Sequence, residues 1–274
     1  MISRLPNSNL RRLSLVLVLV AAQLAILALV AASADAVTAA RWYLRNSNSA
    51  GVSDIAFNYG DWGGTMSPVA GDWDSNGTDT PGMFDTAGGS PANWHLRNFN
   101  SAGAANIFRE YGLASAKPIV RDWNCEGAQT NVYKDGAWYL RRADGGTQVE
   151  NFGGSAWVPA IGPWATCTDD LIVFNPSTGQ WKYLIDNGLT ELTYYYGSPG
   201  DIALIGDWDG NGSSEPGVYR PSTSQFHLAY GGESNWTRTR VIFAYGNPGA
   251  GWKPVVGDWN GDGVDTIGLV APTP

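Results

Sequence analysis

Apolar and polar residues alternate in short segments that recur along the chain. In the segment RWYLRN (41–46), Trp42 and Leu44 fall on one face of an extended chain, while Tyr43 and Arg45 fall on the other. Such alternation is typical of a β-strand with one buried face. The pattern returns in NWHLRN (93–98), AWYLRR (137–142), QWKYL (180–184) and QFHLAY (225–230). The chain therefore contains an internal repeat of strand-forming segments.

A second segment repeats in step with the first. Three copies align without gaps and two are more divergent: GDWDSNGTDTPGMF (71–84), GDWDGNGSSEPGVY (206–219), GDWNGDGVDTIGLV (257–270), RDWNCEGAQTNVY (121–133) and GPWATCTDDLIVF (162–174). A third segment ends in an aromatic residue and glycine, as in FNYG (57–60). Together these segments predict four short strands in each unit of roughly 46 residues, separated by turns rich in glycine and proline.

Five units of this kind predict an all-β protein, a β-propeller of five four-stranded blades spanning residues 41–270. The order of the segments supports a closed ring. The chain after residue 40 starts with the third and fourth strands of a unit and ends with a first and second strand. Pairing of the two ends would complete one blade and leave no open sheet edge. The alternative is an open β-solenoid, in which five repeats stack without closing.

The N-terminal segment has the features of a signal peptide covering residues 1–36. Arg4, Arg11 and Arg12 precede an apolar run at 13–32, and small residues follow it. The alternative is an uncleaved membrane anchor, because the run has about the 20 apolar residues that a bilayer span needs. Both interpretations place the repeats outside the cytoplasm, so we expect a protein that is secreted or at the cell surface. Cleavage would leave no membrane segment in the chain.

Composition narrows the classes of partner. The chain has a net charge of −8, only 15% charged residues, and 13 tryptophans. An acidic chain repels phosphate backbones, so nucleic acid is not an expected partner. The many tryptophans exclude a disordered chain, which lacks aromatic residues to bury.

Carboxylate and amide side chains occupy alternate positions of the three intact loops. Calcium takes about six to eight oxygen ligands, and the loop glycine permits the tight turn that lets such side chains converge. The candidate ligands are Asp72, Asp74, Asn76 and Asp79 in the first loop, Asp207, Asp209, Asn211 and Glu215 in the fourth, and Asp258, Asn260, Asp262 and Asp265 in the fifth. The alternative is a turn closed by its own side chains without a metal. An EF-hand is excluded, because its bidentate glutamate is replaced by Met83, Val218 and Leu269.

The D-x-[DN]-x-[DN]-G loop between two strands resembles the FG-GAP or VCBS class of extracellular repeats, known from integrin α-chain propellers and bacterial surface proteins. The resemblance covers residues 41–270. It implies a propeller fold, calcium in the loops, and a role in adhesion or ligand binding. The family normally has aspartate at the ninth loop position, where this chain has Thr80, Glu215 and Thr266.

The two cysteines, Cys125 and Cys167, occupy the same loop in adjacent, divergent repeats. Equivalent loops of neighbouring blades lie side by side in a propeller. We therefore expect a disulfide that replaces calcium at this junction, as an oxidising compartment permits.

The sequence does not indicate an enzyme. His95 and His227 occupy the repeat position that Tyr43 and Tyr139 hold elsewhere, which favours a strand surface. No nucleophile elbow, H-E-x-x-H motif or P-loop occurs.

Three tryptophans outside the repeat pattern lie between one unit's fourth strand and the next unit's first strand: Trp62, Trp157 and Trp252. Aromatic rings at equivalent loops could stack on sugar rings and act together. The alternative is packing between blades. We expect an extracellular binding or adhesion module for a glycan or a surface protein. A structural or accessory propeller is the alternative, and an enzyme that acts on polysaccharides is the third candidate.

Overall fold

The computed structural model describes residues 38–121, 127–142, 144–162, 170–185, 188–230 and 239–273 of the 274-residue chain. The expected signal peptide (1–36) and both cysteines, Cys125 and Cys167, lie outside these residues. No helix among the described residues is long and apolar enough to cross a membrane.

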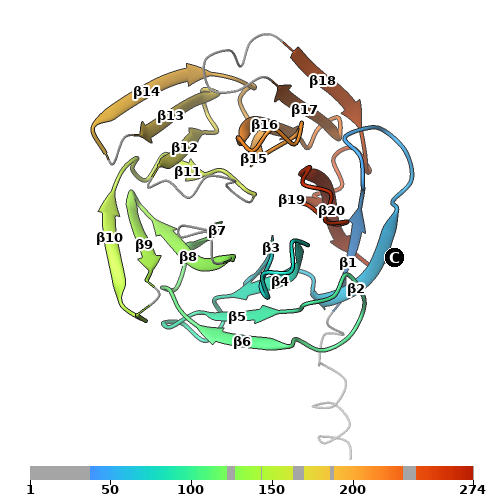
Figure 1. Cartoon of the computed structure of the whole chain (residues 1–274), viewed down its shortest axis with the longest axis horizontal. Coiled ribbons are helices and arrows are strands. Elements are labelled where there is room, and N and C mark those ends of the chain that lie inside the picture. Colours follow the sequence, from blue (N-terminus) through green and yellow to red (C-terminus); the bar gives the residue numbers. More distant parts are fainter. Residues whose placement is uncertain are drawn as a thin grey trace, which may run out of the picture. The chain divides into compact units, whose positions relative to one another are not determined.

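The described chain forms five antiparallel sheets of four strands each, arranged as a ring (Figure 1). This confirms the predicted five-bladed β-propeller and excludes the open solenoid. The blades, numbered here from the first strand of each unit, are as follows: blade 1, β3 (Met66–Gly71), β4 (Thr80–Asp85), β5 (Asn93–Leu96) and β6 (Ile107–Glu110); blade 2, β7 (Lys117–Arg121), β8 (Gln129–Lys134), β9 (Ala137–Arg141) and β10 (Thr147–Asn151); blade 3, β11 (Val158–Pro159), β12 (Leu171–Asn175), β13 (Gln180–Ile185) and β14 (Thr190–Tyr195); blade 4, β15 (Ile202–Gly206), β16 (Glu215–Arg220), β17 (Gln225–Tyr230) and β18 (Thr239–Ala244); blade 5, β19 (Lys253–Gly257), β20 (Thr266–Pro272), β1 (Ala39–Leu44) and β2 (Ile55–Asp61).

Blade 5 joins the two ends of the described chain. Strand β1 pairs with β20 in antiparallel register, with Trp42 opposite Val270 and Leu44 opposite Gly268. The sheet order β19-β20-β1-β2 is therefore the same as in the other blades. Closure in this way pairs the edges that an open array would leave exposed.

The first strand of each blade lines the centre of the ring. These inner strands enclose a cavity of about 370 Å³ with mostly apolar walls. Pro68, Pro118, Pro159 and Pro254 occupy one register position in four of the five inner strands. Proline is tolerated there because the inner strand is the edge of its sheet and needs fewer ladder donors.

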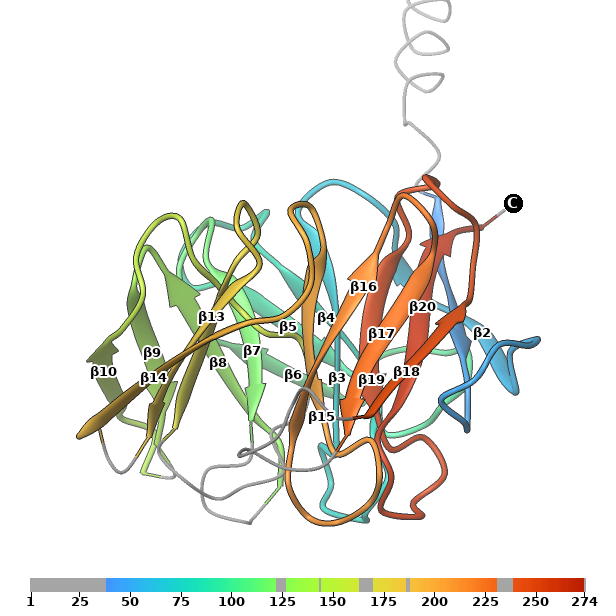
Figure 2. The same ribbon diagram turned by 90° about the horizontal axis from the view of Figure 1, so that it is seen from above.

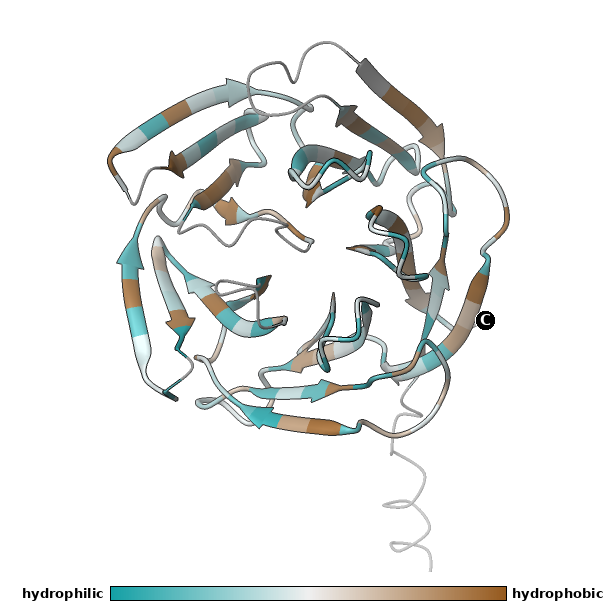
Figure 3. Ribbon diagram, in the orientation of Figure 1, coloured by the Kyte–Doolittle hydropathy of each residue, from teal (hydrophilic) through white to brown (hydrophobic). Residues whose placement is uncertain are grey.

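The third strand of each blade carries the residue that anchors the packing between blades. Trp42, Trp94, Trp138 and Trp181 are fully buried at equivalent positions. Each indole donates a hydrogen bond, of 2.8 to 3.0 Å, to the carbonyl of the aromatic residue that precedes glycine in the fourth-strand segment. The alternation predicted for these third strands is therefore confirmed. Bands of opposite hydropathy also mark the outermost strands β10 and β14 (Figure 3).

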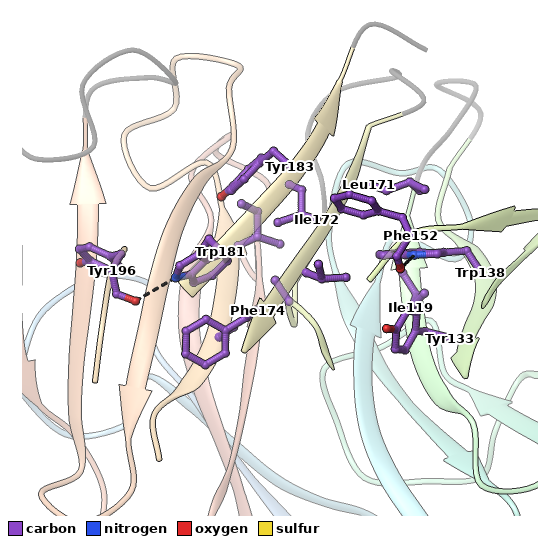
Figure 4. Packing of buried hydrophobic residues seen from close by; sticks show 14 of the residues in the cluster. Ile119, Tyr133, Trp138, Phe152, Leu171, Ile172, Phe174, Trp181, Tyr183 and Tyr196 are labelled. Atoms are coloured by element: carbon purple, nitrogen blue, oxygen red, sulfur yellow. Dashed lines mark hydrogen bonds between the residues drawn. The ribbon is translucent and has the colours of Figure 1, made fainter. Parts of the chain in front are cut away.

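The largest buried cluster packs blades 2, 3 and 4 against one another (Figure 4). Trp181 is fully buried within it. Its ring lies beside Phe174 at a centroid distance of 5.1 Å, and its indole N–H donates to the carbonyl of Tyr196. The tryptophan thus fills the space between sheets and also satisfies a backbone acceptor.

We expect Trp181→Phe to lower the free energy of unfolding by roughly 2–4 kcal/mol, because it removes buried ring atoms and leaves the Tyr196 carbonyl without its donor. Urea unfolding followed by tryptophan fluorescence would measure the loss. Trp62→Phe, at a half-buried position, is the matched control and should cost less. Equal losses for the two variants would contradict this role of the repeated tryptophan.

Candidate functional site

The three intact acidic loops follow the inner strands β3, β15 and β19 at residues 72–79, 207–214 and 258–265. They project from one face of the ring, below the strands in the view of Figure 2. Each loop connects the first strand of its blade to the second, as the repeat predicts. The candidate ligands are therefore placed at one end of the inner strands.

The first aspartate closes each turn. The Asp72 carboxylate accepts hydrogen bonds from the backbone N–H groups of Asn76 and Gly77, at 3.0 and 2.8 Å. Asp207 accepts from Asn211 and Gly212 at 3.0 and 2.7 Å.

Asp258 accepts from Gly261, Asp262 and Gly263 in the same way. Gly77, Gly212 and Gly263 adopt positive φ of 82° to 86°, a conformation that favours glycine. The loops are thus preformed by their own side chains, and a carboxylate used in this way keeps further lone pairs for a cation.

The loop of blade 4 brings three carboxylates together. Oxygen atoms of Asp207, Asp209 and Glu215 lie within 4.8 Å of one another. Glu215 is fully buried, and its backbone carbonyl accepts the indole N–H of Trp208 at 2.9 Å. Two ligand oxygens on one calcium ion are each roughly 2.3–2.6 Å from it, so this spacing is compatible with a shared cation.

Asn211 also contacts this cluster, but through its amide nitrogen and not through the oxygen that could bind a cation. Its amide oxygen accepts the backbone N–H of Ser213 at 2.8 Å, and its amide nitrogen donates to Glu215 at 3.3 Å. The turn therefore directs the nitrogen of Asn211 towards the carboxylates. Of the four residues predicted for this loop, three present oxygen atoms to a common centre.

The loops of blades 1 and 5 bring together fewer carboxylates than the loop of blade 4. Among the described residues, only blade 4 has three carboxylates within 4.8 Å. The ninth loop position holds Thr80 and Thr266. The Thr80 hydroxyl donates to the Gly71 carbonyl at 3.3 Å, and the Thr266 hydroxyl donates to the Arg45 carbonyl at 2.7 Å, with the Gly257 carbonyl at 3.3 Å. Asp74, Asn76, Asn260 and Asp262 stay in the exposed part of their loops.

Asp79 and Asp265, predicted as ligands of their own loops, bind the neighbouring blade instead. The Asp79 backbone N–H donates to the Asp258 carbonyl at 2.7 Å, and its carboxylate accepts the Asp258 N–H at 2.8 Å. Asp265 makes the same pair of bonds with Asp207, at 2.8 and 2.7 Å. We call these two reciprocal pairs the interblade clamps.

The clamps explain the glycine that precedes each loop. A Cβ atom added at Gly257 would lie 2.8 Å from the Cβ of Asp79, and one at Gly206 would lie 3.0 Å from that of Asp265. Only glycine leaves room for the clamp side chain of the next blade. In blade 2 the clamp position is Ala128, which keeps the backbone bond, to the Asp72 carbonyl at 2.9 Å.

Two asparagines that the sequence analysis missed complete the clamps. Asn48 donates to the Asp265 carbonyl at 2.8 Å, and Asn100 donates to the Asp79 carbonyl at 3.0 Å. Both come from loops with the shared sequence RNxNSAG, which follows the third strand in blades 5 and 1. The repeated asparagine in this segment was the available signal.

Burial dominates the electrostatics of the clamps. It raises the pKa of Asp79 to about 7. The hydrogen bond from the Asp258 backbone opposes this rise, and the charges of Asp258 and Asp72 add to it. Burial and the nearby Asp79 raise the pKa of Asp265 well above its usual range. The clamp therefore favours a protonated carboxyl at mildly acidic pH.

The three tryptophans proposed to stack on sugars are half-buried between blades. Trp62, Trp157 and Trp252 each pack against a different buried cluster. Trp252 stacks on Tyr43 with ring centroids 5.2 Å apart, and the ammonium of Lys253 lies 5.2 Å from the Trp62 ring centroid. These contacts favour the packing alternative while leaving part of each ring exposed.

Neither a family model, nor a curated protein, nor a solved structure matches the chain. The resemblance to FG-GAP and VCBS repeats therefore remains a hypothesis based on the loop residues.

The raised pKa of Asp79 predicts a pH dependence of stability. Because the folded-state pKa lies above the unfolded value near 4, this group contributes most to stability below about pH 4 and loses that contribution as pH rises to about 7. Asp79→Asn keeps an acceptor for the Asp258 N–H but does not titrate. We expect the decline in the free energy of unfolding between about pH 4 and pH 7 to be shallower in this variant.

The measurement is urea unfolding at several pH values in the presence of a chelator. Asp74→Asn removes the same charge from an exposed position of the same loop, so it separates burial from net charge. A pH profile of Asp79→Asn that superimposes on the wild-type profile would show that the clamp carboxyl does not titrate in this range.

Proposed function

We propose that this protein is an exported, non-enzymatic propeller that binds calcium in the loop of blade 4 and serves as a binding or adhesion module. The observation that carries the calcium proposal is the convergence of Asp207, Asp209 and Glu215 within 4.8 Å. Three carboxylates form a hard, negatively charged donor set, which suits calcium better than a softer transition metal.

Repeat comparison supports blade 4 as the metal site. Glu215 is the one carboxylate at a ninth loop position among the three intact loops, where the others carry Thr80 and Thr266. It is also fully buried and lies close to two further carboxylates, so its negative charge is costly there. A bound cation would offset both that burial and the repulsion from Asp207 and Asp209.

Calcium at this position would hold two blades together. Asp207 is both a candidate ligand and the partner of the Asp265 clamp from blade 5. A cation that fixes the Asp207 carboxylate would therefore also fix the backbone that the clamp uses. We infer a stabilising role for the metal, with ligand binding carried by other surfaces of the ring.

Added calcium should raise the melting temperature of the wild-type protein, and a chelator should lower it. At a calcium concentration about 100 times the dissociation constant, binding to the folded state alone contributes about 2.7 kcal/mol. Glu215→Gln and Asp209→Asn should each lose most of this increment, because each removes one charged ligand. Asp209 is exposed, so its variant tests the site without disturbing the core.

Glu110→Gln, at an exposed carboxylate on β6, is the matched control and should keep the full calcium response. A wild-type melting temperature that does not respond to calcium, or a response that persists in both variants, would refute the blade 4 site.

The ligand of the module is a second question, and a glycan is the candidate we favour. The exposed parts of Trp62, Trp157 and Trp252 occupy equivalent inter-blade loops and would act as several weak sites together. We expect binding on a glycan array in calcium, weakened about tenfold or more by Trp157→Ala and lost when a chelator loosens the ring.

An array without binding, together with a calcium-dependent melting temperature, would instead favour a structural or accessory propeller. Turnover of a polysaccharide panel would contradict the non-enzymatic assignment.

A further inference from the structure

A second cavity, of about 370 Å³, lies between blades 1 and 2. Its walls are mostly polar and include Trp73 and Arg109 from blade 1 and Gln129, Thr130, Arg141 and Arg142 from blade 2. Among the described residues that line it there are three arginines and no carboxylate. This concentration of positive charge stands out in a chain whose net charge is −8.

Arg109 occupies a position that three of the other four blades give to an aromatic ring, whereas blade 2 has the exposed Glu150 there. Arg109 lies opposite Trp94 in the β5–β6 pair, as Phe57 lies opposite Trp42 and Phe243 opposite Phe226. Phe57 and Phe243 are buried and stack on their partners, with centroids 6.0 and 5.6 Å apart.

The fold therefore accepts an aromatic ring at this position in three blades. The propeller does not need arginine at this position for packing. The charged side chain of Arg109 therefore suggests a role in binding.

Arg141 corresponds to Arg45 and Arg97 at the end of the third strand, but it lacks their surroundings. The Arg45 guanidinium donates to Ser47, Ser49 and the Asp54 carboxylate, at 2.9 to 3.0 Å.

Arg97 donates to the backbone carbonyls of Ser101, Ala102 and Ala104, at 2.7 to 2.8 Å. The loops that supply these acceptors span 45–54 and 97–106, whereas the corresponding loop of blade 2 spans only 142–146. The shorter loop leaves the Arg141 guanidinium without a hydrogen bond or ion pair to any described residue, and it faces the cavity.

The two half-buried arginines repel one another. Burial and the charge of Arg141 both lower the pKa of Arg109. Like charges that are partly removed from water destabilise the folded state unless an opposite charge offsets them. Since neither guanidinium has an ion-pair partner among the described residues, a bound anion would supply that charge.

We propose that the cavity between blades 1 and 2 binds a doubly charged oxyanion, a sulfate or phosphate group, through Arg109, Arg141 and Arg142. The planar guanidinium presents paired N–H donors that match the oxygen atoms of such groups. Three arginines favour a doubly charged group over a single carboxylate. The site lies away from the blade 4 loop and does not depend on the calcium proposal.

Isothermal titration calorimetry with inorganic sulfate and inorganic phosphate tests this site. The ionic strength is held constant with chloride, because salt screens exposed charges. Wild-type protein should bind at least one of the two ions, and Arg141→Gln should weaken that binding about tenfold or more. Glucose 6-phosphate and glucose 6-sulfate, compared with the free ions, distinguish a sugar-borne group from the inorganic anion.

Arg109→Phe gives the sharper test, because it introduces the aromatic type of residue that three other repeats carry at this position. This variant should keep or raise the melting temperature while losing anion binding. Arg41→Gln, at a half-buried arginine of β1 outside the cavity, should bind as the wild type does. Failure of the wild type to bind any of the four anions, or undiminished binding in both Arg109→Phe and Arg141→Gln, would overturn the proposal.

Discussion

Pairing of β1 with β20 is the constraint on which the rest of the structure depends. It places strands from opposite ends of the chain in one sheet and completes the fifth blade. Closure fixes the angle between neighbouring blades, because five sheets must share one full turn. The repeated tryptophans of the third strands then pack in the wedges between sheets, each satisfying one carbonyl of its own blade. Equivalent loops of adjacent blades are thereby brought into contact.

The acidic loops divide their carboxylates between two tasks. The first aspartate of each loop accepts backbone N–H groups and so closes the turn. The aspartate at the eighth position, Asp79 or Asp265, instead accepts a backbone N–H of the preceding blade. A carboxylate used as a clamp is no longer available to its own loop. Only blade 4 adds a buried glutamate at the ninth position, which assembles a cluster that suits a cation.

Divergence among the repeats indicates where to look for binding. In blades 5 and 1 the RNxNSAG loops enclose an arginine and support a clamp. In blade 2 the corresponding loop is shorter, and its described residues do not supply hydrogen-bond acceptors to Arg141, which lines the cavity. On the facing blade, Arg109 lies opposite Trp94, where three other blades have an aromatic side chain. Neither change has an evident packing benefit, so a role in binding is the simplest physical explanation.

The sequence by itself determined the strand pattern and the number of units, because these follow from short-range alternation and an internal repeat. It favoured a closed ring, but only the tertiary structure excluded the open solenoid. The sequence also identified the loops that carry carboxylates. Only the tertiary structure decided which carboxylates meet. Asp79 and Asp258 are 179 residues apart, and their contact exists only because the ring closes. Arg109 and Arg141 likewise lie in different strands and become neighbours only because blades 1 and 2 pack side by side. The order of residues along the chain does not reveal such contacts between blades.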